Sequence, residues 1–203
     1  NHADVLKHLV LVAILKYLKA KPKPLCYVDS HAAAGGYSLM ESEAQKRQEY
    51  QSGIAKLWQR CDLPESLKDY CELVSQFNPD RELTRYPGSP WLAAQLLGET
   101  DQLWLHELHN NEVENLRNAF RGDRRGKVVH DDGYQGVISL SPPKQRRGLV
   151  LIDPSYELKS EYQQVVDTLI NAHRRFATGV YALWYPVVDR ARIDRIEKSL
   201  KKS

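Results

Sequence analysis

The chain has 203 residues, of which 42% are hydrophobic and 27% charged, and 29 Lys plus Arg against 26 Asp plus Glu give a net charge of +3. This composition is typical of a globular domain and excludes a disordered or fibrous chain. The length suits one domain with room for an insertion. The longest apolar run, residues 9–15, is shorter than the roughly 18 residues of a membrane span. A charge of +3 does not by itself indicate a nucleic-acid-binding protein.

Cysteine and histidine usage argues against disulfides and metal sites. Cys26, Cys61 and Cys71 form no disulfide framework and fit a reducing cytoplasm. No Cys-x-x-Cys pair is present, and His106 and His109 lack the spacing of a zinc protease, so we expect no metal. The chain begins without Met, and both ends look like cuts in a longer protein.

The hydrophobic pattern alternates between helical and strand-like segments. It predicts a helix over 3–20, a strand over 25–28, a polar two-helix excursion over 41–78, and a helix with Ser89 as N-cap and Pro90 as first residue. It then predicts strands over 102–108, 127–134, 148–156 and 179–188, helices over 110–121 and 160–176, and a basic helix at the end. Near-continuous apolar strands linked by helices are typical of an α/β fold with a parallel sheet covered on both faces. We expect its core to comprise residues 1–40 and 79–203.

Polar residues follow four of the predicted strands, where parallel sheets bind their ligands. They are Asp29 with His31, then Glu107, Asp132 and Asp153. Carboxylates gathered at one edge repel one another unless a ligand or hydrogen-bond donors satisfy them. The four strand ends together therefore indicate a ligand site.

Each of the first three strand ends also has an ordinary explanation. The small-residue turn after Asp29 allows a ligand close to the backbone, or is a simple strand-to-helix turn; no Gly-Lys-Ser/Thr follows, so it is not a phosphate loop. Glu107 suits a ribose diol, or is an exposed carboxylate. Asp132 before Gly133 accepts from an adenine amino group, or forms an Asp-Gly turn.

The most informative motif is Asp153-Pro154-Ser155-Tyr156, directly after the apolar run Leu149–Ile152. A carboxylate and a backbone carbonyl can accept both protons of a planar amine while an aromatic ring stacks on the heterocycle. The alternative is an Asp-Pro turn with a packing tyrosine.

Seven segments in order resemble the RlmJ family, also called YhiR: NHADVLKH, DSHAAAGGY, YPGSP, HELH, DDG, GLVLIDPSYE and RFATGVYALWYPVV. The resemblance covers essentially the whole chain. It implies a class I, Rossmann-like, S-adenosylmethionine-dependent methyltransferase that modifies adenine N6 in 23S ribosomal RNA. It also implies a helical insertion at 41–78, and further N-terminal residues and C-terminal strands absent from this chain.

The resemblance also implies roles for individual residues. Asp153, Pro154 and Tyr156 resemble the catalytic motif, with Tyr156 stacking on the target base and Asp153 also touching the cofactor. Lys7 beside His8 resembles a residue that positions cofactor or RNA, although a solvated helix lysine is the alternative. The cofactor-binding residues it implies are His8, His31, Ser89, Glu107, Asp132, Gly133 and Asp153.

Two residues depart from the family pattern. Ser155 replaces the second proline of the Asp-Pro-Pro-Tyr motif, from which we expect a looser turn. Ala33 replaces a glycine, so its β-carbon narrows the pocket or opposes a positive φ.

Two other functions stay open from the sequence. A DNA adenine-N6 methyltransferase shares the Asp-Pro-Pro-Tyr motif, and Ser155 and Ala33 leave room for a weakly active module that binds an adenosyl ligand or RNA. An NAD enzyme lacks its glycine fingerprint here. Residues 174–203 carry eight Lys or Arg and three acids. This basic segment either contacts RNA or forms a solvated face. We expect a cytoplasmic monomer whose partner is 23S ribosomal RNA.

Overall fold

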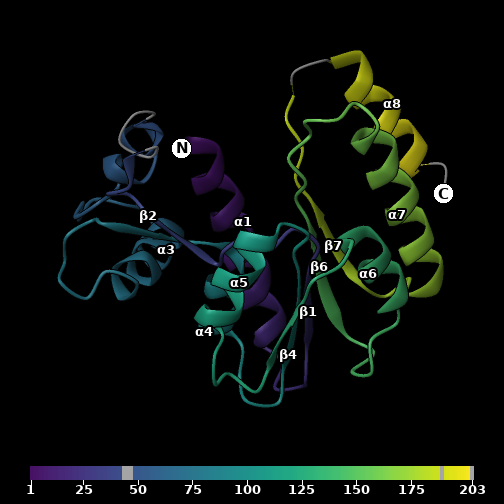
Figure 1. Cartoon of the computed structure of the whole chain (residues 1–203). Helices are drawn as coiled ribbons and strands as arrows, with labels where there is room; N and C mark the ends of the chain where they lie inside the picture. Colours follow the sequence, from purple (N-terminus) through teal and green to yellow (C-terminus); the bar gives the residue numbers. More distant parts are fainter. Residues whose placement is uncertain (43–47, 188–189, 202–203) are drawn as a thin grey trace.

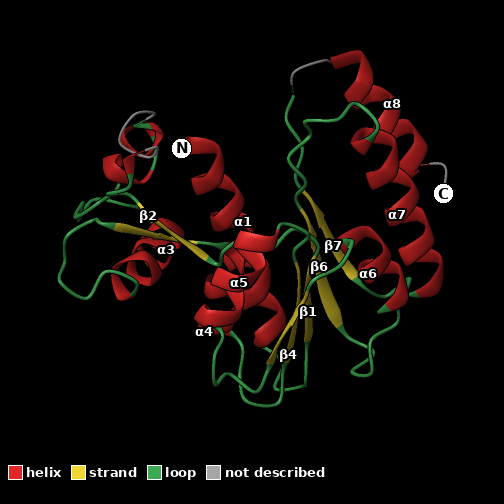
Figure 2. Cartoon of the chain, viewed as in Figure 1, coloured by secondary structure: helices red, strands yellow, loops and turns green. Residues whose placement is uncertain are grey.

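The computed structural model describes residues 1–42, 48–187 and 190–201. Its centre is a sheet of five parallel strands in the order β5-β4-β1-β6-β7 (Figure 2). The strands are β1 (Cys26–Asp29), β4 (Gln102–His106), β5 (Gly126–Val129), β6 (Gly148–Ile152) and β7 (Val180–Leu183). The expected α/β class with a parallel sheet is confirmed.

The central strands β1 and β6 are buried along their whole length, as their apolar sequences predict. Asp29 pairs with Leu105 of β4 on one side and with Leu151 of β6 on the other. This register brings the carboxyl ends of the three strands to the same edge, so the polar residues that follow them lie together.

Helices cover both faces of the sheet (Figure 1). One face packs against α1 (His2–Lys19), α4 (Ser89–Leu96) and α5 (Asn110–Ala119), which bury Leu11, Leu15, Ala93 and Leu116. The other face packs against α6 (Gly133–Ser139), α7 (Glu161–Arg175) and α8 (Arg190–Lys201), which bury Val137, Val165, Leu169 and Ile193. Within the described residues, no helix is long and apolar enough to cross a membrane.

The excursion after β1 forms a lobe at one side of the sheet (Figure 1). It holds β2 (Gly36–Ser38), which pairs antiparallel with β3 (Arg85–Pro87), the 3₁₀ turns η1 (Glu49–Ser52) and η2 (Ile54–Lys56), and α3 (Glu65–Gln76). A third buried cluster joins the lobe to the first half of α1 through Val5, Val12, Ile54 and Tyr70. The predicted first helix of the excursion is therefore wrong over 49–58, where Gly53 separates two 3₁₀ turns; residues 43–47 lie outside the described ones.

Several predicted boundaries also need correction. The strands end earlier than expected, because Glu107, Asp132 and Asp153 lie beyond the paired residues and in loops or caps. Ser89 is the first residue of α4, and the N-cap is Gly88. A short antiparallel pair, β2–β3, and helix α6 were not predicted.

Candidate active site

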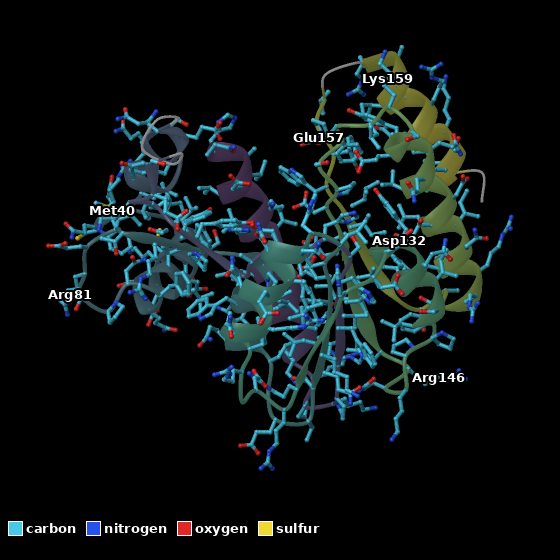
Figure 3. All side chains as sticks on the ribbon, in the orientation of Figure 1. Met40, Arg81, Asp132, Arg146, Glu157 and Lys159 are labelled. Atoms are coloured by element: carbon cyan, nitrogen blue, oxygen red, sulfur yellow. The ribbon has the colours of Figure 1, made fainter. Side chains whose placement is uncertain are left out.

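A cavity of about 770 Å³ opens at the carboxyl edge of the sheet. Its lining residues come from the start of α1 on one side and from the segment between β6 and α7 on the other. Figure 1 shows where these two parts of the chain lie. Nine of the ten proposed site residues line it: Lys7, His8, His31, Ser89, Glu107, Asp132, Gly133, Asp153 and Pro154. In Figure 3, Asp132 marks the start of α6 and Glu157 the β6–α7 segment, whereas Arg146 marks the opposite end of the sheet.

The carboxylate of Asp153 pairs with Lys7, whose Nζ donates to Asp153 Oδ2 at 2.5 Å. Lys7 Nζ also lies 3.6 Å from Asp4 Oδ1. Burial opposes the charge on Lys7, but Asp153 and Asp4 outweigh it and raise the Lys7 pKa. The helix α1 thus places a permanent cation against the carboxylate that follows β6.

Glu107 holds the loop that follows β1. Its two carboxylate oxygens accept from the backbone N–H groups of Ala33 at 2.8 Å and His109 at 2.7 Å. Ala33 is left-handed, with φ +50°, so the β-carbon is accommodated at a position that favours glycine. Each carboxylate oxygen can accept more than one hydrogen bond, so Glu107 retains capacity for hydroxyl groups in the cavity.

Asp132 and Gly133 begin α6 rather than a turn. The side chain of Asp132 caps the helix by accepting from Tyr134 N at 2.8 Å. A β-carbon on Gly133 would lie 1.8 Å from the carbonyl oxygen of Ser30. Glycine therefore lets α6 and the loop after β1 meet at the wall of the cavity.

Asp29 is wholly buried behind this wall. Its Oδ2 accepts from the hydroxyls of Tyr27 and Ser89, each at 2.7 Å, and its Oδ1 accepts from His31 N at 3.3 Å. Burial raises the pKa of Asp29 to about 6, although the bonds from Ser89 and Tyr27 favour the ionised form. Asp29 itself does not line the cavity, whereas Ser89, whose hydroxyl group donates to Asp29, does.

Burial lowers the pKa of two of the histidines that line the cavity, His8 and His31. Burial lowers the pKa of His8 to about 3, and the ring stacks on Tyr86 with centroids 5.4 Å apart. Burial likewise lowers the pKa of His31, against the opposing effect of Asp153. His31 Nδ1 lies 2.7 Å from Ser30 Oγ, and its ring packs edge-on against Tyr134. Both rings offer the cavity an uncharged surface with nitrogen atoms.

Tyr156 is the one proposed site residue that the structure does not bring to the cavity. Its hydroxyl donates to the carbonyl of Trp184 at 2.8 Å, and its ring packs against Tyr162 with centroids 4.6 Å apart. The residue has a left-handed φ of +57°. The structure therefore does not place this ring at the cavity, and its stacking on a base stays a prediction.

Sequence reasoning missed several residues that line the cavity. Asp4 comes from the helix that carries Lys7, Tyr37 from β2, and Glu161 and Gln164 from the start of α7. The spacing of Asp4 and Lys7 by three places them on one helix face and was a usable signal. No group of three metal ligands occurs in the parts of the chain that are described.

The fold and this site define a class of protein. A five-stranded parallel sheet, with acidic side chains beyond β4, β5 and β6 around one cavity, is a Rossmann-like arrangement of the kind that binds a ligand at the carboxyl ends of its strands. The family described as "Ribosomal RNA large subunit methyltransferase D, RlmJ" matches residues 22–203. The chain belongs to this family of methyltransferases.

Three relatives illustrate the similarity. The chain is 49% identical to Ribosomal RNA large subunit methyltransferase J of Escherichia coli K12, over 99% of this chain and 72% of the relative. It is 48% identical to the Haemophilus influenzae protein of the same name, with the same coverage. The crystal structure of a Legionella pneumophila protein superposes on this chain with a TM-score of 0.93 and 38% sequence identity. The match covers 100% of this chain and 74% of the Legionella chain.

Proposed function

We propose that this chain transfers a methyl group from S-adenosylmethionine to the exocyclic N6 of an adenine in 23S ribosomal RNA. The observation that carries the proposal is Asp153-Pro154 at the end of β6, where it faces the cavity beside Glu107 and Asp132. Membership of the RlmJ family supports the same reaction and the RNA substrate.

The residues around the cavity fit an adenosyl cofactor. Glu107 can accept from the two ribose hydroxyls, and Asp132 at the start of α6 can accept from an adenine amino group. Because Gly133 has no β-carbon, the start of α6 can lie against the backbone of Ser30 at this part of the cavity wall. Ser89 and His31 line the same cavity, on the side of β1 and α4. When bound, S-adenosylmethionine supplies an electrophilic methyl group on a sulfonium.

Asp153 and Pro154 position the adenine amino group. The amino nitrogen is a poor nucleophile because its lone pair is delocalised into the ring. Hydrogen bonds from its two protons to an Asp153 oxygen and the Pro154 carbonyl favour a more tetrahedral nitrogen and aim its lone pair. Such positioning and preorganised electrostatics can contribute several kcal/mol. Methyl transfer would form the N–C bond as the sulfonium S–C bond breaks and S-adenosylhomocysteine leaves, and Asp153 is placed at the cavity to take one amino proton.

Lys7 orients the Asp153 carboxylate. Its ammonium engages Oδ2, which leaves Oδ1 as the acceptor for the adenine amino group. The pair is part-buried, so water screens it less than a surface ion pair. Lys7 thus holds one oxygen while the other meets the substrate.

The target adenine must leave its stack to enter a site of this kind. Six carboxylates line the cavity: Asp4, Glu107, Asp132, Asp153, Glu157 and Glu161. They disfavour phosphate groups inside, so the base alone enters while the RNA backbone stays at the rim. Residues of a single chain line the described cavity, and we propose that the enzyme acts as a monomer, in the cytoplasm where ribosomal RNA is assembled.

The test is methyl transfer from labelled S-adenosylmethionine to deproteinised 23S ribosomal RNA, with duplex DNA in parallel. We expect label in the RNA as N6-methyladenosine. Equal or greater labelling of the DNA would favour a DNA methyltransferase. Cofactor binding without transfer to any nucleic acid would favour a binding module.

A further inference from the structure

The carboxylate of Asp29 accepts two hydroxyl hydrogen bonds on one oxygen, from Tyr27 and Ser89. An ionised carboxylate has no proton to give, so both hydroxyls must donate to it. The Ser89 proton is therefore committed to Asp29. Toward the cavity, Ser89 Oγ has only lone pairs and can act only as an acceptor.

Asp29 also has no ion-pair partner among the described residues. No cation of the described chain lies within ion-pair distance of it, and the negative charge of Asp153 acts against its ionisation. Lys7, from α1, feels the charge of Asp29 but is paired with Asp153. A buried carboxylate without a cation favours the approach of a positive group. Ser89 lies between Asp29 and the cavity, so a positive group in the cavity can interact with Asp29 through the Ser89 hydroxyl.

The start of α4 offers few donors to a carboxylate. Gly88 N–H is bonded to Gly35 O at 2.9 Å, and Pro90 has no N–H. The backbone donors left at this end are those of Ser89 and Trp91. The side chain of Ser89 adds no donor toward the cavity, because its hydroxyl proton is given to Asp29.

We propose that Asp29 is a positioning residue that fixes Ser89 Oγ as an acceptor, so that Ser89 binds the α-ammonium group of the amino-acid portion of the cofactor. The inference rests on the proposed function, because it takes the cavity to be the adenosyl-cofactor site. It assigns a role to a buried residue that never touches the ligand.

The test uses S-adenosylhomocysteine, which has the α-ammonium but no sulfonium charge, and its desamino analogue, which keeps the carboxylate. Calorimetric titration of the unmodified chain should show tighter binding of the amine by at least about 10-fold, as expected for a hydrogen bond to a charged group. In Asp29→Asn and in Ser89→Ala this preference should fall to about threefold or less.

Tyr27→Phe is the matched control, because it removes the other hydroxyl from the same carboxylate oxygen without touching the cavity. It should keep the preference for the amine. If Asp29→Asn and Ser89→Ala both keep it as well, the inference is overturned. If the unmodified chain does not bind S-adenosylhomocysteine at all, the proposed function fails and the inference with it.

A pH series on the unmodified chain needs no variant to fold. Burial raises the pKa of Asp29 to about 6, so the carboxylate is ionised at pH 7.5 and protonated at pH 5. The preference for the amine should decline over that interval, in which the ligand's ammonium stays charged. The groups facing Asp29 are Tyr27, His31, Ser89, Lys7 and Asp153; the decline should be absent in Asp29→Asn if Asp29 causes it. A preference that is constant with pH would contradict the proposal.

Discussion

Single residues at the strand ends divide into those that face the cavity and those that hold them. Asp153 and Glu107 line the cavity, whereas Asp29 is buried and acts on Ser89. The first two could be found from the sequence, because several strand-end carboxylates at one edge of a parallel sheet together indicate a ligand site. The polarity of Ser89 could not, because it depends on a contact between residues 60 positions apart.

Asp153→Ala tests the catalytic assignment. The change removes the acceptor for the adenine amino group, so we expect methyl transfer to fall by at least about 100-fold, in line with the loss of a preorganised electrostatic contact. Binding of S-adenosylhomocysteine, measured by calorimetry, should change far less. Turnover near that of the unmodified enzyme would refute the role of Asp153.

His8 makes the stability of the fold depend on pH. Its pKa is about 3 in the folded state and near 6.5 when unfolded, because burial disfavours the imidazolium. Between these values the unfolded state binds a proton that the folded state does not. The stabilisation is therefore complete above pH 6.5 and declines as the pH falls, by up to about 1.4 kcal/mol per pH unit.

Urea denaturation of the unmodified chain and of His8→Gln at pH 7 and pH 5 measures this effect. The loss of unfolding free energy on acidification should be smaller in His8→Gln, and the comparison cancels the contribution of other groups. Equal losses in the two proteins would show that His8 does not carry the effect.

Secondary-structure elements bring the site together through close backbone approaches. The short helix α6 meets the loop after β1 at Gly133, and α4 follows β3 directly at Gly88. A β-carbon on Gly88 would lie 2.9 Å from the backbone of Gly35. These contacts fix the cavity walls more firmly than the loops alone would.

Gly133→Ala should disturb the wall near Asp132. The new methyl group would overlap the carbonyl oxygen of Ser30, so α6 must move, and overpacking of this kind costs about 1–3 kcal/mol. We expect a lower thermal midpoint and weaker binding of S-adenosylhomocysteine. Gly98→Ala is the control, since the nearest atom to its β-carbon, Asp101 Oδ2, is 3.7 Å away. Unchanged cofactor binding in Gly133→Ala would contradict the close approach.

The central elements could be predicted from the sequence because continuous apolar runs leave buried parallel strands as the simplest solution. The 3₁₀ turns at 49–56 could not be separated from a helix, because their apolar residues have helical spacing and only Gly53 breaks them. The pairing of β2 with β3 joins segments about 50 residues apart, which local pattern does not reveal. Tyr156 was expected at the cavity, but its hydroxyl donates to the carbonyl of Trp184, a contact 28 positions further along the chain that local pattern does not reveal either.

At the scale of the whole molecule, the charge is unevenly distributed. Residues 174–203 carry a net +5, which leaves −2 for residues 1–173. The cavity is rich in carboxylates, while α8 and the β6–α7 segment present cations such as Arg195 and Lys159 around a groove between α7 and α8. Lys159 shares this groove with Arg195, Ile196 and Ser199 of α8, and Figure 3 shows Glu157 on the same β6–α7 segment as Lys159.

Charge reversal on α8 tests whether this surface contacts RNA. Arg195→Glu with Lys198→Glu removes two exposed cations, so affinity for 23S RNA fragments should fall and the slope of log affinity against log salt should become shallower by about 1–2. Binding of S-adenosylhomocysteine should not change. Lys56→Glu with Lys68→Glu, on the far lobe, is the matched control. Equal losses in the two double variants would indicate general electrostatics rather than an RNA-binding face.

The central claim is that the carboxylate after β6 directs methylation of an adenine amino group in ribosomal RNA. Its most direct test is nucleoside analysis of deproteinised 23S RNA after incubation with labelled S-adenosylmethionine and either the unmodified chain or Asp153→Ala. We predict labelled N6-methyladenosine with the unmodified chain and a nearly complete loss with Asp153→Ala. Label in another nucleoside, or equal N6-methyladenosine from both proteins, would contradict the account.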